Sequence, residues 1–116
     1  MTMQEPLSPV VGAQLSSVEF VRDYVQLRFD GPCLTAFTPP MMRVGKTWVK
    51  WGSPGYRDLL CDRIGTTVCL ASVIEEKEIR IEFDDGALLA ISLRPEDYSG
   101  AEAAMFDNGP QETWVW

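Results

Sequence analysis

Two stretches of this chain share one pattern, and it constrains the fold more than any other feature of the sequence. Residues 17–40 (SVEFVRDYVQLRFDGPCLTAFTPP) and 72–95 (SVIEEKEIRIEFDDGALLAISLRP) align with single-residue shifts. In both, apolar and polar residues alternate and lead into an Asp-Gly pair, which is typical of a half-buried strand before a tight turn. We therefore predict two similar β-hairpins. Duplication of one segment and convergence on one hairpin chemistry would both explain the likeness.

A further extended run precedes each predicted hairpin, which indicates a three-stranded antiparallel meander in each copy. The first strands are predicted at Ser17–Arg22 and Thr66–Ile74, and the turns after them at Arg22-Asp23 and Glu75–Lys77. The return strands are predicted at Leu34–Thr38 and Leu88–Leu93. The predicted apolar core consists of Val25, Leu27, Phe29, Leu34, Phe37, Leu59, Ile79, Ile81, Phe83, Leu89, Ile91 and Leu93.

A short helix is predicted after each meander. In the first, Ser53 can cap the helix, Pro54 suits its first position and Gly65 ends it. The apolar face of this helix would be Tyr56, Leu59, Leu60 and Ile64. In the second, Ser99–Glu102 has the form of a capping box before a helix at Ala101–Phe106.

Two tryptophan-rich segments complete the predicted elements. Thr47–Trp51 (TWVKW) and Thr113–Trp116 (TWVW) are each predicted to form a strand that carries two tryptophans, and we expect the second to be docked. With 116 residues, the chain has room for one domain. The predicted fold class is α+β and mainly antiparallel β. In it, one domain over 1–116 joins the two meanders into a curved or barrel-like sheet with two short helices.

Charge is unevenly distributed along the chain. The whole sequence has ten basic and seventeen acidic residues and a net charge of −7, whereas residues 73–116 alone hold eleven acidic and three basic residues. A concentrated negative field attracts basic partners. We therefore predict that the second copy binds a basic protein partner through acidic side chains, namely Glu75, Glu78, Glu82, Asp84 and Asp97. A hydrated polar face is the simpler interpretation of the same charges.

Catalysis is disfavoured by the residue types that are missing. The sequence has no histidine, which removes the Ser-His-Asp and Cys-His nucleophile systems and histidine metal ligands. No calcium-loop spacing occurs either. We predict no catalytic residues, no metal site and no cofactor, although activity of another kind stays open.

Three further interpretations rest on aromatic residues. A pocket between the two copies, lined by Trp48, Trp51, Tyr56 and Tyr98, would suit a small-molecule binder or a modest enzyme. The two tryptophan strands could instead form a homodimer interface. Basic residues also lie among these aromatics, at Arg43, Lys46, Lys50, Arg57 and Arg63. That mixture suits single-stranded nucleic acid, but the net charge of −7 argues against nucleic acid as a partner.

The sequence also suggests a compartment. The first ten residues lack the charge and the apolar run of a signal peptide, and no apolar stretch approaches the length of a membrane span. The cysteines, Cys33, Cys61 and Cys69, form an odd set without metal-site spacing, which is typical of buried reduced thiols. We therefore expect a cytoplasmic protein that does not bind membranes.

One segment resembles a known group of proteins. Residues 81–105 (IEFDDGALLAISLRPEDYSGAEAAM) are similar to the C-terminal half of short uncharacterised bacterial proteins with an F-x-D-G hairpin, a Y-x-G-P-E-A motif and a terminal tryptophan. The matching residues are Tyr98, Gly100, Glu102, Ala103 and Trp114, and Ala101 replaces the usual proline. Some of these proteins resemble immunity proteins encoded beside bacterial toxins. The resemblance implies a non-enzymatic binding role, immunity-like or regulatory, and supplies no catalytic residues.

Overall fold

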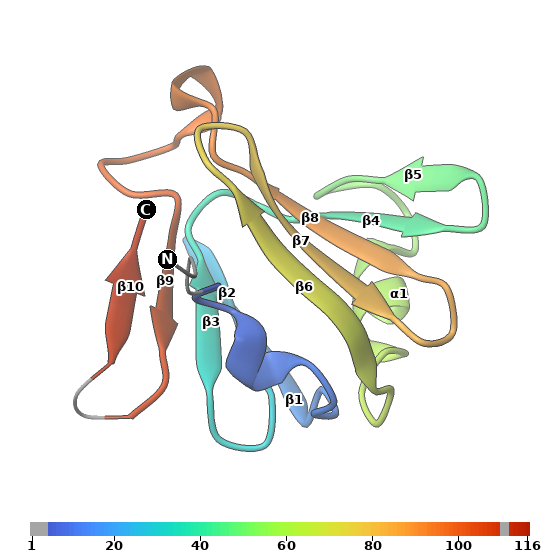
Figure 1. Cartoon of the computed structure of the whole chain (residues 1–116). Coiled ribbons are helices and arrows are strands. Elements are labelled where there is room, and N and C mark those ends of the chain that lie inside the picture. The colour runs from blue at the N-terminus through green and yellow to red at the C-terminus, as the bar shows by residue number, and fades with distance from the viewer. Residues whose placement is uncertain (1–4, 110–111) are drawn as a thin grey trace.

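The computed structural model describes residues 5–109 and 112–116, which form two five-stranded antiparallel sheets that face each other as a wedge (Figure 1). The first sheet has the order β1 (Ser17–Val21), β2 (Tyr24–Arg28), β3 (Cys33–Ala36), β9 (Ala104–Asp107), β10 (Thr113–Val115). The second has the order β5 (Thr47–Val49), β4 (Met41–Val44), β8 (Leu88–Ser92), β7 (Glu78–Phe83), β6 (Val68–Ile74). The prediction of a mainly antiparallel β fold is confirmed.

Each predicted meander forms three adjacent strands of one sheet, and the hairpin that follows it crosses to the other sheet. After β1-β2-β3, the chain enters the second sheet as β4-β5, and after β6-β7-β8 it returns to the first sheet as β9-β10. The two repeats therefore exchange their tryptophan hairpins. This exchange explains why the meanders form two open sheets and not the single curved or barrel-like sheet that we expected.

Equivalent residues of the two repeats occupy equivalent places in the core. Leu27 pairs with Leu34 in the first sheet, and Ile81 pairs with Leu89 in the second. All four side chains are fully buried. The matched Ser-Val pairs at the start of the two repeats are displaced along their strands, because Val18 pairs with Leu27 whereas Val73 pairs with Ile79.

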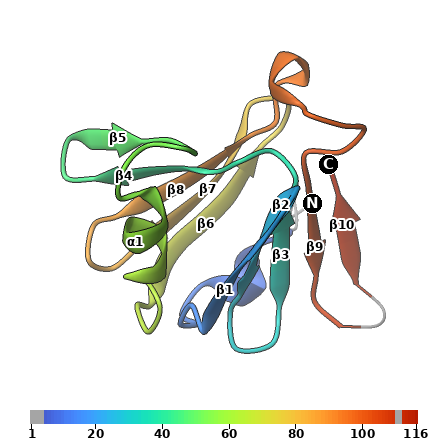
Figure 2. The same cartoon turned by 180° about the vertical axis from the view of Figure 1, so that it is seen from behind.

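Two non-strand segments fill the open sides of the wedge (Figures 1 and 2). The 3₁₀ turn η1 (Ser8–Val10) packs against β6, and the helix α1 (Tyr56–Cys61) contacts β1 and β4. Most predicted core side chains are buried in one cluster between the sheets, and only Phe37 and Leu59 are half-buried.

The first predicted helix is present but shorter than expected. Gly55, with a φ of 82°, precedes α1, and the Ser53 side chain makes no capping bond to it. The turn after α1 leaves Ile64 45% exposed, so the predicted apolar face ends early.

The second predicted helix, at Ala101–Phe106, is wrong. This segment contains β9, which pairs with β3 and β10 and buries Ala104 and Phe106 on alternate positions. Ser99 does not cap a helix, since its hydroxyl donates to the Phe37 carbonyl at 3.0 Å. The only helical turn nearby is the 3₁₀ turn η2 (Pro95–Asp97). Pairing with two strands outweighed a two-turn helix with few contacts of its own.

Candidate functional site

The β6–β7 turn and η2 lie toward the same end of the molecule as the end of β10 (Figure 1). Residues of these segments line one cavity of about 510 Å³. The lining residues are Glu75, Glu76, Leu93, Pro95, Tyr98, Val115 and Trp116. They come from both sheets and from the connection between β8 and β9. We call this cavity the acidic–aromatic pocket, because two carboxylates stand beside two aromatic rings.

The backbone holds the walls of the pocket in place. The Leu93 amide donates to the Lys77 carbonyl at 3.0 Å, which ties the end of β8 to the β6–β7 turn. On the other wall, the Ala103 amide donates to the backbone oxygen of Trp116 at 2.7 Å. Both aromatic rings, of Tyr98 and Trp116, are half-buried and packed against the core. The pocket therefore has a firm apolar side.

The carboxylate side of the pocket lies on a strained turn. Glu76 has a φ of 62°, in the left-handed region that glycine and asparagine favour. Glu75 and Glu76 are exposed, and neither takes part in an ion pair among residues 5–109 and 112–116. Both carboxylates are therefore available to pair with a cation at the mouth of the pocket.

The predicted acidic residues fall into two groups. Glu75, Glu78 and Asp97 lie at the pocket end of the second sheet, where Ser92 pairs with Glu78 and donates to the Asp97 carboxylate at 2.5 Å. Glu78 also pairs with Arg80 at 2.9 Å. Glu82 and Asp84 lie toward the other end of β7, so they cannot act at the same site.

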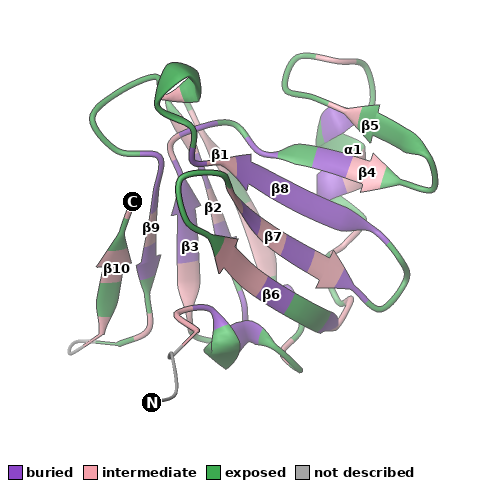
Figure 3. Ribbon diagram, turned by 45° about the horizontal axis from the view of Figure 1, so that its top comes forward, coloured by how far each residue is buried: buried purple, intermediate pink, exposed green. Residues whose placement is uncertain are grey.

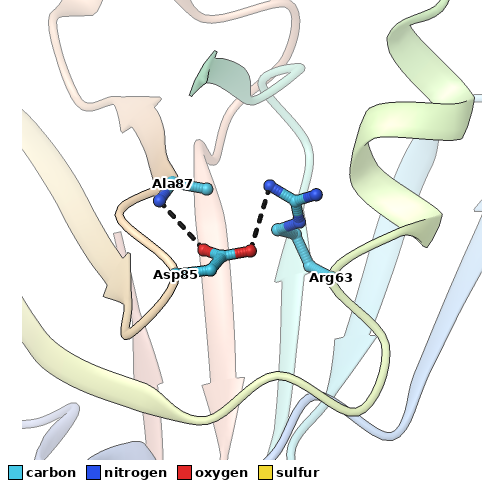
Figure 4. A network of polar contacts seen from close by, with 3 residues as sticks. All are labelled: Arg63, Asp85 and Ala87. Carbon is cyan, nitrogen blue, oxygen red and sulfur yellow. Dashed lines mark hydrogen bonds and ion pairs between the residues drawn. The ribbon is translucent and has the colours of Figure 1, made fainter. Parts of the chain in front are cut away.

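At that other end, the next acidic residue is already neutralised. Figure 4 shows the Asp85 carboxylate between the Arg63 guanidinium, 3.3 Å away, and the Ala87 amide, which donates to it at 3.0 Å. The Arg63 side chain is largely buried. This contact joins the loop after α1 to the β7–β8 hairpin and is structural.

The structure brings together two of the four residues of the predicted aromatic pocket. The rings of Trp51 and Tyr56 are 5.7 Å apart and line a separate cavity of about 410 Å³ at the start of α1. Trp48 lies on the outer face of the second sheet, with the Arg43 guanidinium 5.8 Å from its ring. Tyr98 belongs to the acidic–aromatic pocket.

Tyr56 holds one side of the Trp51–Tyr56 aromatic pair in a fixed position. Its hydroxyl donates to the Pro40 carbonyl at 2.5 Å, and burial raises the pKa of this phenol well above its usual value. Trp51 also packs against Phe20, with ring centres 6.2 Å apart. A shallow cavity of about 350 Å³ adjoins Trp51, with Val25 and Ala36 among its lining residues. These contacts give the cluster a packing role between β1 and α1.

The sequence predicted Glu75 as a partner-binding residue and assigned Tyr98 to a different pocket, but it singled out neither Glu76 nor Trp116 as a site residue. Trp116 was expected only as part of a docked strand, which β10 confirms. Its place beside Glu75 depends on the exchange of hairpins between the sheets, and no local pattern signals that exchange. A terminal strand that is rich in tryptophan was the one available hint.

The remaining expectations concern metals, thiols and membranes. No cluster of three or more potential metal ligands occurs within the described part of the chain. The three cysteines are free thiols, but Cys61 and Cys69 are exposed, so burial was the wrong expectation for them. No helix among the residues that the structure describes is long and apolar enough to cross a bilayer. No protein-family model, curated protein or solved structure matches the chain.

Proposed function

We propose that this protein is a non-enzymatic binding protein that captures a basic side chain of a protein partner in the acidic–aromatic pocket. The observation that carries the proposal is the position of Glu75 and Glu76 beside Tyr98 and Trp116 at one cavity of about 510 Å³.

The chemistry of the pocket matches an arginine or lysine side chain. Carboxylates form charge-assisted hydrogen bonds with a guanidinium or ammonium group, and aromatic faces attract the same cations. The apolar residues Leu93 and Pro95 would contact the methylene stem, which basic side chains bury while the charge stays at a polar group. A neutral or acidic side chain would leave two carboxylates unpaired.

The geometry favours this site over the aromatic pocket as the main binding site. Trp48 and Tyr98 lie apart from Trp51 and Tyr56, so these four residues do not form the one pocket on which the small-molecule alternative was based. The acidic bias of the second half adds long-range attraction for a basic partner. An immunity-like or regulatory role, in which the protein neutralises such a partner, is the form that the sequence resemblance supports.

Calorimetric titration of the full chain with a hexa-arginine peptide tests the proposal. We expect binding that weakens with added salt, since exposed charges are screened at about 10 Å in 0.1 M salt. The double variant Glu75→Lys with Glu76→Lys should weaken binding at least about tenfold, because each lost charge-assisted hydrogen bond contributes roughly 1.5–3 kcal/mol.

Asp84→Lys is the control for long-range attraction, because it reverses one charge of the same half at the far end of β7, half the charge change of the double variant. Because it acts only through long-range electrostatic attraction, this variant should change the dissociation constant for hexa-arginine less than threefold. If Asp84→Lys weakens binding as much as the pocket variant does, the attraction is general and the pocket does not bind the side chain. Binding that ignores both changes would also contradict the proposal.

A further inference from the structure

The outer face of the second sheet is not covered by any other element of the described chain (Figure 3). Strand pairing defines one row of side chains that crosses this face from edge to edge. In strand order the row is Trp48, Arg43, Leu88, Glu82, Leu70. Its two end residues are exposed, Trp48 by 45% and Leu70 by 49%. Exposed apolar side chains gathered on one face of a sheet are typical of an interaction surface.

The neighbouring rows of this face mix apolar residues with the Arg80–Glu78 ion pair and with serines of β6 and β8. Met41 and Ile74 are 40% and 38% exposed and lie on the β4 and β6 sides of the sheet. The central strand β8 adds the fully covered Leu88, the small Ala90 and the half-buried Ser92, none of which belongs to the core between the sheets. Two small or covered apolar residues therefore lie at the centre of the face, charged residues and Met41 flank them, and the other exposed apolar residues lie on the edge strands.

The charges of this row have opposite signs on opposite sides of β8. Arg43 lies one strand to one side of Leu88, and Glu82 lies one strand to the other. Neither takes part in an ion pair within residues 5–109 and 112–116. The Arg43 Nε atom is buried and has no hydrogen-bond partner there. The Arg43 guanidinium lies 5.8 Å from the Trp48 ring and has no carboxylate partner among the described residues, so a partner that supplies a carboxylate would stabilise it.

The row is complementary to itself. A two-fold axis parallel to β8 exchanges its two halves, so a second copy would place Glu82 opposite Arg43 and Leu70 opposite Trp48. Every contact would occur twice, as an isologous interface requires. Two sheets that pack face to face are about 10 Å apart, which side chains of this size can fill.

We propose that the outer face of the β5-β4-β8-β7-β6 sheet binds a second copy of this chain, with Arg43 of each copy paired to Glu82 of the other. This homodimer does not depend on the acidic–aromatic pocket. It differs from a dimer of both tryptophan strands, because Trp114 and Trp116 pack toward the core. Of the two tryptophan strands, only β5, which contains Trp48, takes part in the proposed interface.

Sedimentation velocity of the full chain from 1 to 100 µM tests the proposal. The wild-type protein should sediment as a dimer at the upper concentration. Arg43→Glu and Glu82→Arg should each raise the dimer dissociation constant at least about 100-fold, because each places two pairs of like charges at the interface. The combined variant, with both substitutions, should restore the dissociation constant to within about tenfold of wild type.

The first sheet provides matched controls. Arg28 and Asp107 occupy the places in that sheet that correspond to Glu82 and Arg43, and Arg28→Glu and Asp107→Arg should leave the dimer unchanged. A wild-type monomer at 100 µM would overturn the proposal. So would a dimer that ignores the Arg43 and Glu82 variants, or that the first-sheet variants dissociate equally. Failure of the combined variant to restore a dimer, with circular dichroism showing a folded chain, would overturn the specific pairing.

Discussion

The two sheets have the same strand connections. Their inner faces are similar to each other, whereas their outer faces are not. Their equivalent core rows are Val18, Leu27, Leu34, Phe106, Trp114 and Ala71, Ile81, Leu89, Met42, Val49. Their equivalent outer rows are Ser17, Arg28, Cys33, Asp107, Thr113 and Leu70, Glu82, Leu88, Arg43, Trp48. The core rows are apolar throughout, because both sheets bury them in one cluster. In the outer rows, the positions that are basic and acidic in the first sheet are acidic and basic in the second. The end residues are small and polar in the first sheet but large and apolar in the second.

This difference shows where the two repeats are free to change. A core position must fill space against the other sheet, so its substitutions stay apolar. An outer position contacts solvent unless a partner covers it, so the polar row of the first sheet suits water. The apolar and oppositely charged row of the second sheet is the one that suits a partner.

The Thr-Trp-Val motif shows the same point within a single strand. In β5, Trp48 pairs with Arg43 and points outward, and Val49 packs toward the core. In β10, Trp114 pairs with Phe106 and packs toward the core, and Val115 is 54% exposed. The same three residues therefore face opposite ways, because a shift of one residue in register exchanges the two faces of a strand.

The largest expected effect tests this reversal of the motif. Trp114→Thr should lower the free energy of unfolding by about 2 kcal/mol, below the 3–5 kcal/mol of a fully buried aromatic residue, because Trp114 is half-buried. Trp48→Thr should change it by less than about 0.5 kcal/mol, as an exposed position does. Urea denaturation measures both changes in the free energy of unfolding. Each variant is made in an Arg43→Glu background, so that self-association does not contribute to the measured stability. Equal losses would show that the two tryptophans are not oppositely placed.

The sequence predicts the parts of this comparison that are local. Alternation with a period of two and the Asp-Gly turns locate β2 and β7 and their return strands, because each pattern is complete within one hairpin. The exchange of hairpins is not local, so neither the two open sheets nor the Arg43–Glu82 row could be read from the chain. The helix predicted at Ala101–Phe106 failed for the same reason, since pairing with β3 decides that segment.

The candidate site also combines a part that is local in the sequence with a part that depends on long-range strand connections. Glu75 could be predicted because the charge run is visible in the sequence. Tyr98 was assigned to a different pocket, and Trp116 to none, because their position at the same cavity as the β6–β7 turn depends on how the two sheets pack together. Residue types indicate the chemistry of a site, whereas the long-range connections of the strands decide which residues meet.

A middle-sized effect is expected at α1, which follows the first exchanged hairpin. Tyr56→Phe removes the hydrogen bond to the Pro40 carbonyl and should lower the free energy of unfolding by about 1 kcal/mol at pH 7. Burial raises the pKa of Tyr56 above its usual 10.0, so the folded protein keeps this proton when the unfolded chain loses it. Wild-type stability should therefore fall as the pH rises above about 10.

Urea denaturation at pH 7 and pH 10.5 separates the two contributions. The loss between the two pH values should be smaller in Tyr56→Phe than in wild type, because the variant has no phenol at this position. An equal loss in both proteins would mean that Tyr56 does not contribute to the alkaline change. Trp48→Thr, measured in parallel, is a control on the other sheet face.

The smallest expected effect compares the two residues other than glycine that have a positive φ within residues 5–109 and 112–116, one beside each sheet. Asp30 has a φ of 56°, and its carboxylate accepts a hydrogen bond from the Gln14 amide at 3.3 Å, whereas the Glu76 carboxylate has no such bond among the described residues. Glycine relieves the left-handed strain at both positions, but at Asp30 it also removes a bond. Glu76→Gly should therefore raise the free energy of unfolding by about 0.5–1 kcal/mol, and Asp30→Gly should leave it nearly unchanged.

The same Glu76→Gly variant connects this strain to binding. If Glu76 serves the acidic–aromatic pocket, the variant should gain stability in urea denaturation and lose affinity for hexa-arginine, because strain persists where a function needs the residue. A variant that gains stability and binds hexa-arginine as tightly as wild type would remove Glu76 from the site and leave Glu75 as its only carboxylate. A loss of stability would mean that the turn at Glu76 stores no strain, and the contrast with Asp30 would not hold.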